Sequence, residues 1–228
     1  SGFDTKNVNN MNNMFQNCNN LTSLDVSGFD TSKVDAMNGM FFGCNKLTSL
    51  DVSGFVTSNV TNMNDMFNNC SKLTSLDLSE FDTSNVTNMN SMFNGCTTLT
   101  TLDVSNWNTG KVTRMSGMFR GVQMTSLDAL SDWDVSSVKE FGKYGLNSTA
   151  TYMYTYGMFE DCTQLENIDG LSNWNTSSAV DMMSMFRKCS KLKNVNALSL
   201  WNVSRVKYFG DSYNSDNQLG IFSDCESL

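Results

Sequence analysis

The sequence predicts an α/β repeat solenoid, a curved stack of coils with a parallel β-sheet on the concave face and short helices on the convex face. Phenylalanines recur every 26 residues, each followed three residues later by a cysteine or a valine; they are Phe15, Phe41, Phe67, Phe93 and Phe119. A fixed period of this length indicates units that bury their apolar side chains only against their neighbours. Residues 1–228 are therefore predicted to form a single solenoid of about eight registers, with insertions at 142–157 and 210–220.

A strand is predicted in the first half of each unit, here taken as residues 70–95. From Ser75 to Ser79 polar and apolar residues alternate, which is the period of a half-buried strand. Leu76 and Leu78 are expected to point inward. A polar corner follows at residues 81–85, where Asp, Thr, Ser and Asn favour a turn or a helix start.

A short helix is predicted after this corner. The apolar residues Val86, Met89, Met92, Phe93 and Cys96 are spaced by three, three, one and three positions, as on one face of a helix. Paired strands lie about 4.8 Å apart, whereas packed helices need about 8–10 Å. A stack with strands on one side and helices on the other must therefore curve, with the sheet on the inside.

Two recurring motifs resemble a known family. One is L-x-x-L-x-V/L, as in residues 21–26, and the other is M-F-x-x-C-x-x-L, as in residues 66–73. Together with S-x-F/W-D/N-T-S-x-V-x-x-M they resemble the BspA-like leucine-rich repeat family of bacterial and protist surface proteins. The resemblance implies a leucine-rich-repeat stack, an extracellular or cell-surface location, and adhesion to host or extracellular-matrix proteins. It supplies no catalytic residues.

Composition argues against several classes of function. The formal charge of −8 is unsuited to nucleic-acid binding, and the chain contains no histidine for catalysis or metal binding. The seven cysteines include no C-x-x-C pair, so we expect buried free thiols and not a zinc site. Two methionine columns are expected to fill the core. No apolar run approaches the roughly 18 residues of a membrane span.

A column of aspartates is the first candidate binding site, expected on the exposed face of the sheet. Its members are Asp25, Asp51, Asp77, Asp103, Asp128 and Asp169. Like charges on neighbouring strands disfavour each other, so three interpretations stay open. The column is solvated and softened by serine and threonine hydrogen bonds, it contacts a basic partner, or it holds Ca²⁺ between successive carboxylates. No other cofactor is expected. Because all copies have nearly the same surroundings, an enzyme is not expected.

Two detours from the repeat form the second candidate site. They carry or flank all six tyrosines, which are Tyr144, Tyr152, Tyr154, Tyr156, Tyr208 and Tyr213. Insertions in repeat proteins are often on the binding face, and tyrosine is enriched in interfaces. Both detours leave from the same point of the unit and should emerge on the same side. The alternative is that they fold back over the convex surface and shield its helices.

The predicted function is a non-enzymatic recognition or adhesion module that binds a protein or matrix partner at a cell surface or outside the cell. The alternative is a structural spacer or a self-assembling surface array without its own ligand. The chain opens and stops in mid-repeat, so we expect a fragment of a longer array.

Overall fold

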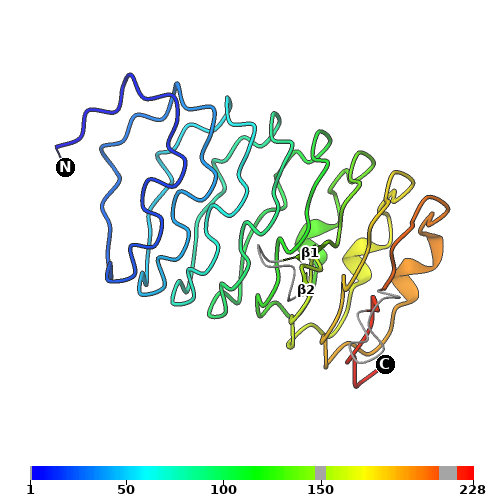
Figure 1. The fold of residues 1–228 in the computed structure, drawn as a ribbon. Helices are drawn as coiled ribbons and strands as arrows, with labels where there is room; N and C mark the ends of the chain where they lie inside the picture. Colours follow the sequence, from blue (N-terminus) through cyan, green and yellow to red (C-terminus); the bar gives the residue numbers. More distant parts are fainter. Residues whose placement is uncertain (1, 147–152, 211–219) are drawn as a thin grey trace.

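The chain forms a row of stacked coils in a computed structural model that describes residues 2–146, 153–210 and 220–228 (Figure 1). Equivalent residues of successive coils lie above one another. Isolated parallel bridges mark this register on one side of the stack, joining in turn Asn10, Ala36, Asn62, Asn88, Arg114, Glu140, Asp181 and Tyr208. We call this the ladder side.

Backbone hydrogen bonds between coils are concentrated on the ladder side. In one coil every second amide donates to the carbonyl of the next coil, at 2.7–3.0 Å; the pairs are Met63 to Asn88, Asp65 to Asn90, Phe67 to Met92 and Asn69 to Asn94. The intervening amides close tight turns within the coil, as Met66 does on Met63 and Cys70 does on Phe67. The polar backbone of this buried segment is thereby satisfied without a regular strand or helix.

The prediction of a helix over residues 86–96 is wrong. Residues Ser91 and Gly95 have φ angles of 54° and 73°, in the left-handed region, which an α-helix does not tolerate. The amides of Met92, Asn94 and Cys96 bond three residues back, and those of Phe93 and Gly95 bond the next coil. The three-residue spacing that suggested a helix comes from these tight turns.

The predicted parallel sheet on the opposite side, which we call the outer side, is also wrong. Residues 74–80 form no strand among the described residues, although Leu76 and Leu78 do point inward. Later coils have short 3₁₀ helices here instead: η1 (Asp128–Leu130), η2 (Asp169–Leu171) and η3 (Asn196–Leu200). The described strands are β1 (Tyr144–Leu146) and β2 (Met153–Thr155), which pair antiparallel within the first detour.

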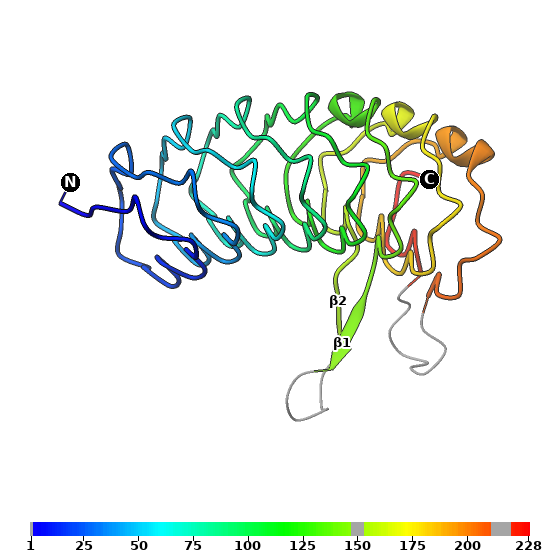
Figure 2. The same ribbon diagram turned by 90° about the horizontal axis from the view of Figure 1, so that it is seen from above.

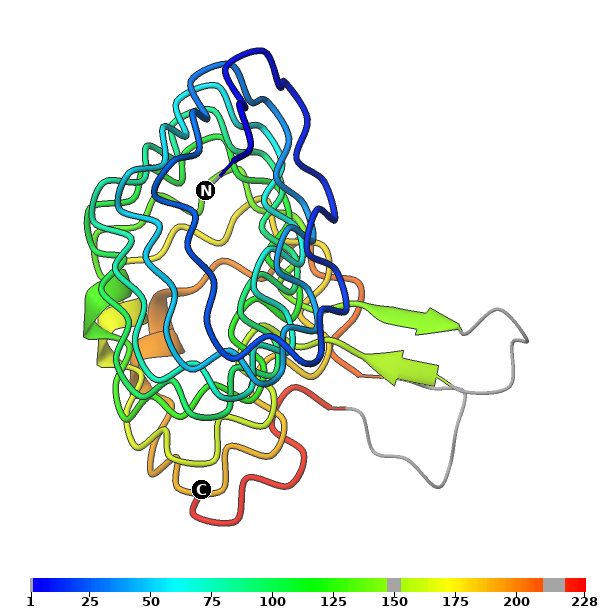
Figure 3. The same cartoon turned by 90° about the vertical axis from the view of Figure 1, so that its left-hand side faces the viewer.

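The stack bends with the ladder side inward and the 3₁₀ helices on the outer, convex side (Figure 2). The physical reason is again that the coils are spaced more closely on one side of the stack than on the other, but the closely spaced side is the ladder side and not the side of the leucines. Bridged backbones are held about 4.8 Å apart, whereas the outer side makes few backbone bonds between coils and can splay. The view along the stack places the 3₁₀ helices and the β1–β2 hairpin on opposite sides (Figure 3).

The core is made of columns of identical side chains. The rings of Phe15, Phe41, Phe67 and Phe93 stack with centroids 5.6–5.7 Å apart. The methionine columns beside them are buried, as predicted, except at Met14 in the first coil; Met37, Met40, Met63, Met66, Met89 and Met92 are all 0 % exposed. Stacked rings and flexible thioethers fill the space between coils without polar groups.

The cysteines are free thiols, as predicted, and five of the seven are buried. They form no disulfide with one another, although they lie in one column next to the ladder. Each thiol after the first donates instead to a carbonyl of the preceding coil, as Cys70 Sγ does to Phe41 O at 3.2 Å. Burial raises the pKa of Cys44 from 9.0 to about 11.

A threonine column ties the corners together. Thr31 is 1 % exposed, and its hydroxyl donates to Val56 O at 3.0 Å while accepting from Val56 N at 2.7 Å. Thr5, Thr57, Thr83, Thr109 and Thr176 are equally buried and donate to the next coil in the same way.

Thr31→Val should destabilise the fold by about 1–2 kcal/mol, because the near-isosteric side chain removes both hydrogen bonds to Val56 and little else. Chemical denaturation measures the difference, with Thr74→Val, at an exposed position, as the control. Equal stability of the two variants would show that the buried hydroxyl contributes nothing.

Native protein at pH 8 should release colour from dithionitrobenzoate for at most two thiols per chain, the half-buried Cys18 and Cys225. Burial disfavours the thiolate, which is the reactive form. All seven thiols should react after unfolding in guanidinium chloride. Rapid reaction of four or more thiols in the folded protein would contradict the buried cysteine column.

Candidate recognition surfaces

The aspartate column lies on the outer, convex side, not on a concave sheet. Asp25, Asp51, Asp77 and Asp103 are exposed, and each accepts hydrogen bonds from the N–H and the hydroxyl of the serine two residues later. At Asp77 these bonds measure 3.0 Å and 2.8 Å. The same local turn is therefore repeated four times.

These serine hydrogen bonds lower the pKa of all four aspartates below 3.8. The largest cause is the serine hydroxyl at Asp25, Asp51 and Asp103, and the serine N–H at Asp77. The charges of Asp51 and Asp103 act on Asp77 in the opposite direction, but they are the smaller effect. Each carboxylate is thus charged and locally satisfied, which favours the solvated interpretation of the column.

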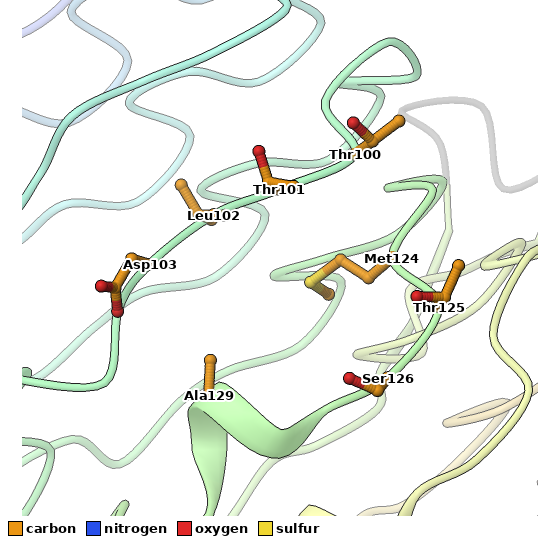
Figure 4. A pocket seen from close by; sticks show the side chains of 8 residues that line it. All are labelled: Thr100, Thr101, Leu102, Asp103, Met124, Thr125, Ser126 and Ala129. Atoms are coloured by element: carbon orange, nitrogen blue, oxygen red, sulfur yellow. The ribbon is translucent and has the colours of Figure 1, made fainter.

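Asp128 and Asp169 do not continue this turn, because each begins a 3₁₀ helix, η1 or η2. The outer side has open hollows of about 310–390 Å³ between coils. One of them is lined by Thr100, Thr101, Leu102, Met124 and neighbours, with Asp103 as its sole charged residue (Figure 4). Within the described ranges no group of three or more Cys, Asp or Glu side chains is placed to hold a metal ion.

The first detour projects from the ladder side as the β1–β2 hairpin (Figures 2 and 3). Tyr144 pairs with Thr155, and Gly145 pairs with Tyr154. The hairpin extends away from the stack, so the alternative of folding back over the convex surface is wrong for its described strands. Tyr152 and Tyr213 lie outside the described residues.

The base of the hairpin is fixed by close packing against the neighbouring coil. Gly142 and Gly157 flank it, and a Cβ on either would collide with the backbone of Met183 or Ser184. Tyr156 N donates to Lys143 O at 2.9 Å, and its ring edge packs beside Gly117. Glycine is required at both ends because no side chain fits there.

A buried charge network lies next to this base and was missed by the sequence reasoning. Glu160 is 0 % exposed, accepts from Gly157 N at 3.1 Å, and pairs with Arg187 at 2.9 Å and Arg120 at 3.4 Å. These residues occupy one position of three successive coils, so their charges alternate along the stack. The signal was present in the sequence, because uncharged residues hold this position in the earlier coils, such as Asn68 and Asn94.

An acidic pair lies on the ladder beside the hairpin. Glu140, Asp181 and Tyr208 are bridged in turn, and with Lys139, Lys143 and Val180 they line a hollow of about 340 Å³. Burial is the largest cause that raises the pKa of Asp181, from 3.8 to about 6. The hydrogen bond from the Met183 N–H lowers this pKa, the charge of Glu140 raises it further, and the charge of Lys143 lowers it. Tyr208 is 45 % exposed. Tyr208 and the hairpin therefore lie on the ladder side of the stack, opposite the aspartate column of the outer side.

Comparison with known proteins identifies one family. The family described as "Mycoplasma protein of unknown function, DUF285" matches residues 1–76, 36–153 and 152–221. No curated protein and no solved structure matches the chain. None of the described helices has the length and apolar character needed to cross a membrane.

Asp181→Asn should stabilise the protein at pH 7–8 and leave its stability unchanged near pH 4. Because the folded-state pKa is raised, the native carboxyl loses stability as the pH climbs from about 4 to above 6, when it must ionise while partly buried. The amide oxygen can still accept from Met183 N, which now bonds Asp181 Oδ1 at 2.9 Å. We expect a gain of about 1 kcal/mol after allowance for solvent screening.

Thermal unfolding at several pH values measures this difference. Glu80→Gln, an exposed change of the same charge, is the matched control. A gain that does not depend on pH, or one shared by the control, would remove Asp181 as its cause.

Proposed function

The chain belongs to the family described as Mycoplasma protein of unknown function, DUF285, and on this premise we propose that it is a non-enzymatic recognition module. It presents its ladder side to a protein or extracellular-matrix partner at a cell surface. The observation that carries the proposal is the β1–β2 hairpin, which projects from an otherwise regular stack on a firmly packed base. The resemblance to BspA-like surface proteins supports the adhesive role and the extracellular location.

The packed base favours recognition over a passive loop. Gly142 and Gly157 pack closely against the next coil, and the Gly157 N–H donates to the carboxylate of Glu160. A buried ion pair of this kind is weak evidence for stability, because desolvation offsets much of the attraction. Its effect here is to fix the direction of the hairpin. A preorganised projection binds a partner at a lower entropic cost than a free loop does.

The exposed aspartates are a secondary part of the proposal. Their serine bonds leave them charged on the convex side, where they can attract a basic partner and raise its association rate. Contributions of this kind are screened by salt, so we assign specificity to the hairpin side and not to the aspartates. The proposed function is non-enzymatic because the four aspartate turns have the same surroundings, so nothing drives the pKa values of their carboxylates apart as acid–base catalysis requires.

A structural spacer is the second candidate. The observation that favours it is the uniformity of the first coils, which repeat the same ladder and phenylalanine stack from Phe15 to Phe119 and the same aspartate turn four times, from Asp25 to Asp103. A stack of this kind can extend other domains or assemble with copies of itself without any specific ligand.

Replacement of residues 144–155 by Asn-Gly should abolish capture of the partner while the stack stays folded, since Gly142 and Gly157 keep their contacts. Binding of the intact chain and the variant to host cells and to immobilised matrix proteins measures the effect, and circular dichroism melting checks the fold. The matched control is the double change Asp51→Asn and Asp77→Asn, on the outer side.

Loss of binding in the hairpin variant alone supports the recognition role. Equal binding by both chains would refute the hairpin as the contact. Absence of binding by the intact chain to every surface, together with concentration-dependent assembly in sedimentation, would favour the spacer.

A further inference from the structure

A second hollow on the ladder side is lined by cations, and none of the described residues that line it is a carboxylate. It has a volume of about 450 Å³ and lies across the last three coils; its lining residues are Lys139, Ser178, Val180, Ser204, Arg205, Val206 and Lys207. The three cations are exposed. This is a local concentration of positive charge on a chain whose formal charge is −8.

The ladder fixes the spacing of these cations. Val180 N donates to Lys139 O at 2.9 Å, and Lys207 N donates to Val180 O at 2.8 Å. Lys139 and Lys207 therefore lie two coils apart in one column, with backbones roughly 10 Å apart. Arg205 precedes Lys207 by two residues. Val180 lies between Lys139 and Lys207 in the column, and Ser178 lines the same hollow.

Several lysines elsewhere on the stack are engaged by the preceding coil, whereas Lys6 and Lys72 are not. Lys33 bonds Asn7, Lys46 bonds Asn20, Lys111 bonds Asn85, Lys191 bonds Gln164 and Lys193 pairs with Glu166, at 2.6–3.1 Å. Lys139, Arg205 and Lys207 have no such partner in the described part of the chain. In the three coils before Lys139 the equivalent position is a threonine that bonds the preceding coil, as Thr87 bonds Thr61 O at 3.2 Å.

We propose that this hollow binds the sulfate or carboxylate group of an acidic saccharide. Two lysines and an arginine that converge on a shallow hollow are suited to an oxyanion, since the guanidinium can bond two of its oxygens at once. The Ser178 and Ser204 hydroxyls line the same space and can bond sugar hydroxyls. The half-exposed ring of Tyr208 lines the adjoining hollow, which shares Lys139, and offers a flat face to a sugar ring.

The surrounding charge limits the length of the ligand. Asp181 and Glu140 lie directly beside the cations, and the molecule as a whole is acidic. A long polyanion such as nucleic acid would extend beyond the hollow and meet these negative charges, whereas a short acidic saccharide would meet fewer of them. The site does not depend on the hairpin and would exist even in a spacer.

Isothermal titration calorimetry tests the proposal with four ligands. They are a heparin-derived hexasaccharide, its fully desulfated and N-acetylated form, a hyaluronan hexasaccharide and inorganic sulfate. We expect a sulfated or carboxylated hexasaccharide to bind more tightly than free sulfate. The double change Lys139→Gln and Lys207→Gln should weaken this binding at least tenfold. The control is Lys33→Gln with Lys46→Gln, which alters the net charge equally and should change the affinity less than twofold.

The heparin hexasaccharide and its desulfated form, which keeps its carboxylates, distinguish a sulfate ligand from a carboxylate ligand, and either result supports the site. Equal weakening by both double variants would show non-specific charge attraction and would overturn it. Tighter binding of a single-stranded oligonucleotide of matched charge, or no binding of any saccharide, would also overturn it. The hairpin variant should keep its saccharide affinity, so failure of this site and failure of the hairpin interface are separable.

Discussion

The hydrogen bonds that pass from each coil to the next on the ladder side are the interaction on which the rest of the structure depends. They place every second amide of one coil on a carbonyl of the following coil, as in the series from Met63 to Asn69. The register of every side-chain column follows from them. Once the coils are aligned, the phenylalanine rings stack, the thiols reach the carbonyls of the preceding coil, and the threonine hydroxyls reach the next corner.

The same bonds explain the shape and the location of the candidate sites. Because only one side is closely bonded, the stack bends around it. Both departures from the repeat begin at ladder positions, so the hairpin, Tyr208 and the cation-lined hollow all belong to the inner side. The aspartate turns are left on the outer side, where they satisfy their own charges through serine. The proposed function therefore rests on the coils in which the repeat changes, and the regular coils support them.

The columns could be predicted from the sequence, because a fixed period places like residues above like whatever the backbone conformation. The buried phenylalanines, methionines and free cysteines follow directly, and so does the inward direction of Leu76 and Leu78. The backbone could not be predicted by the same argument. The spacing Met-x-x-Met-Phe-x-x-Cys fits one face of a helix and also fits a run of tight turns. Asn13 and Asn17, or Gly39 and Gly43, mark the turns, since all four have positive φ angles.

The site was predicted in part. The tyrosine-bearing insertion and its exit from the methionine and phenylalanine side follow from the sequence, whereas the Glu160 network depends on charges that meet only when three coils are stacked. Amide hydrogen exchange tests the central claim most directly. The amides of Met63, Asp65, Phe67 and Asn69 should exchange far more slowly than those of residues 74–78 on the outer side, which donate no backbone hydrogen bond in the structure. Equal or greater protection of the amides of residues 74–78 from exchange would contradict the ladder and would instead support a β-sheet at residues 74–80.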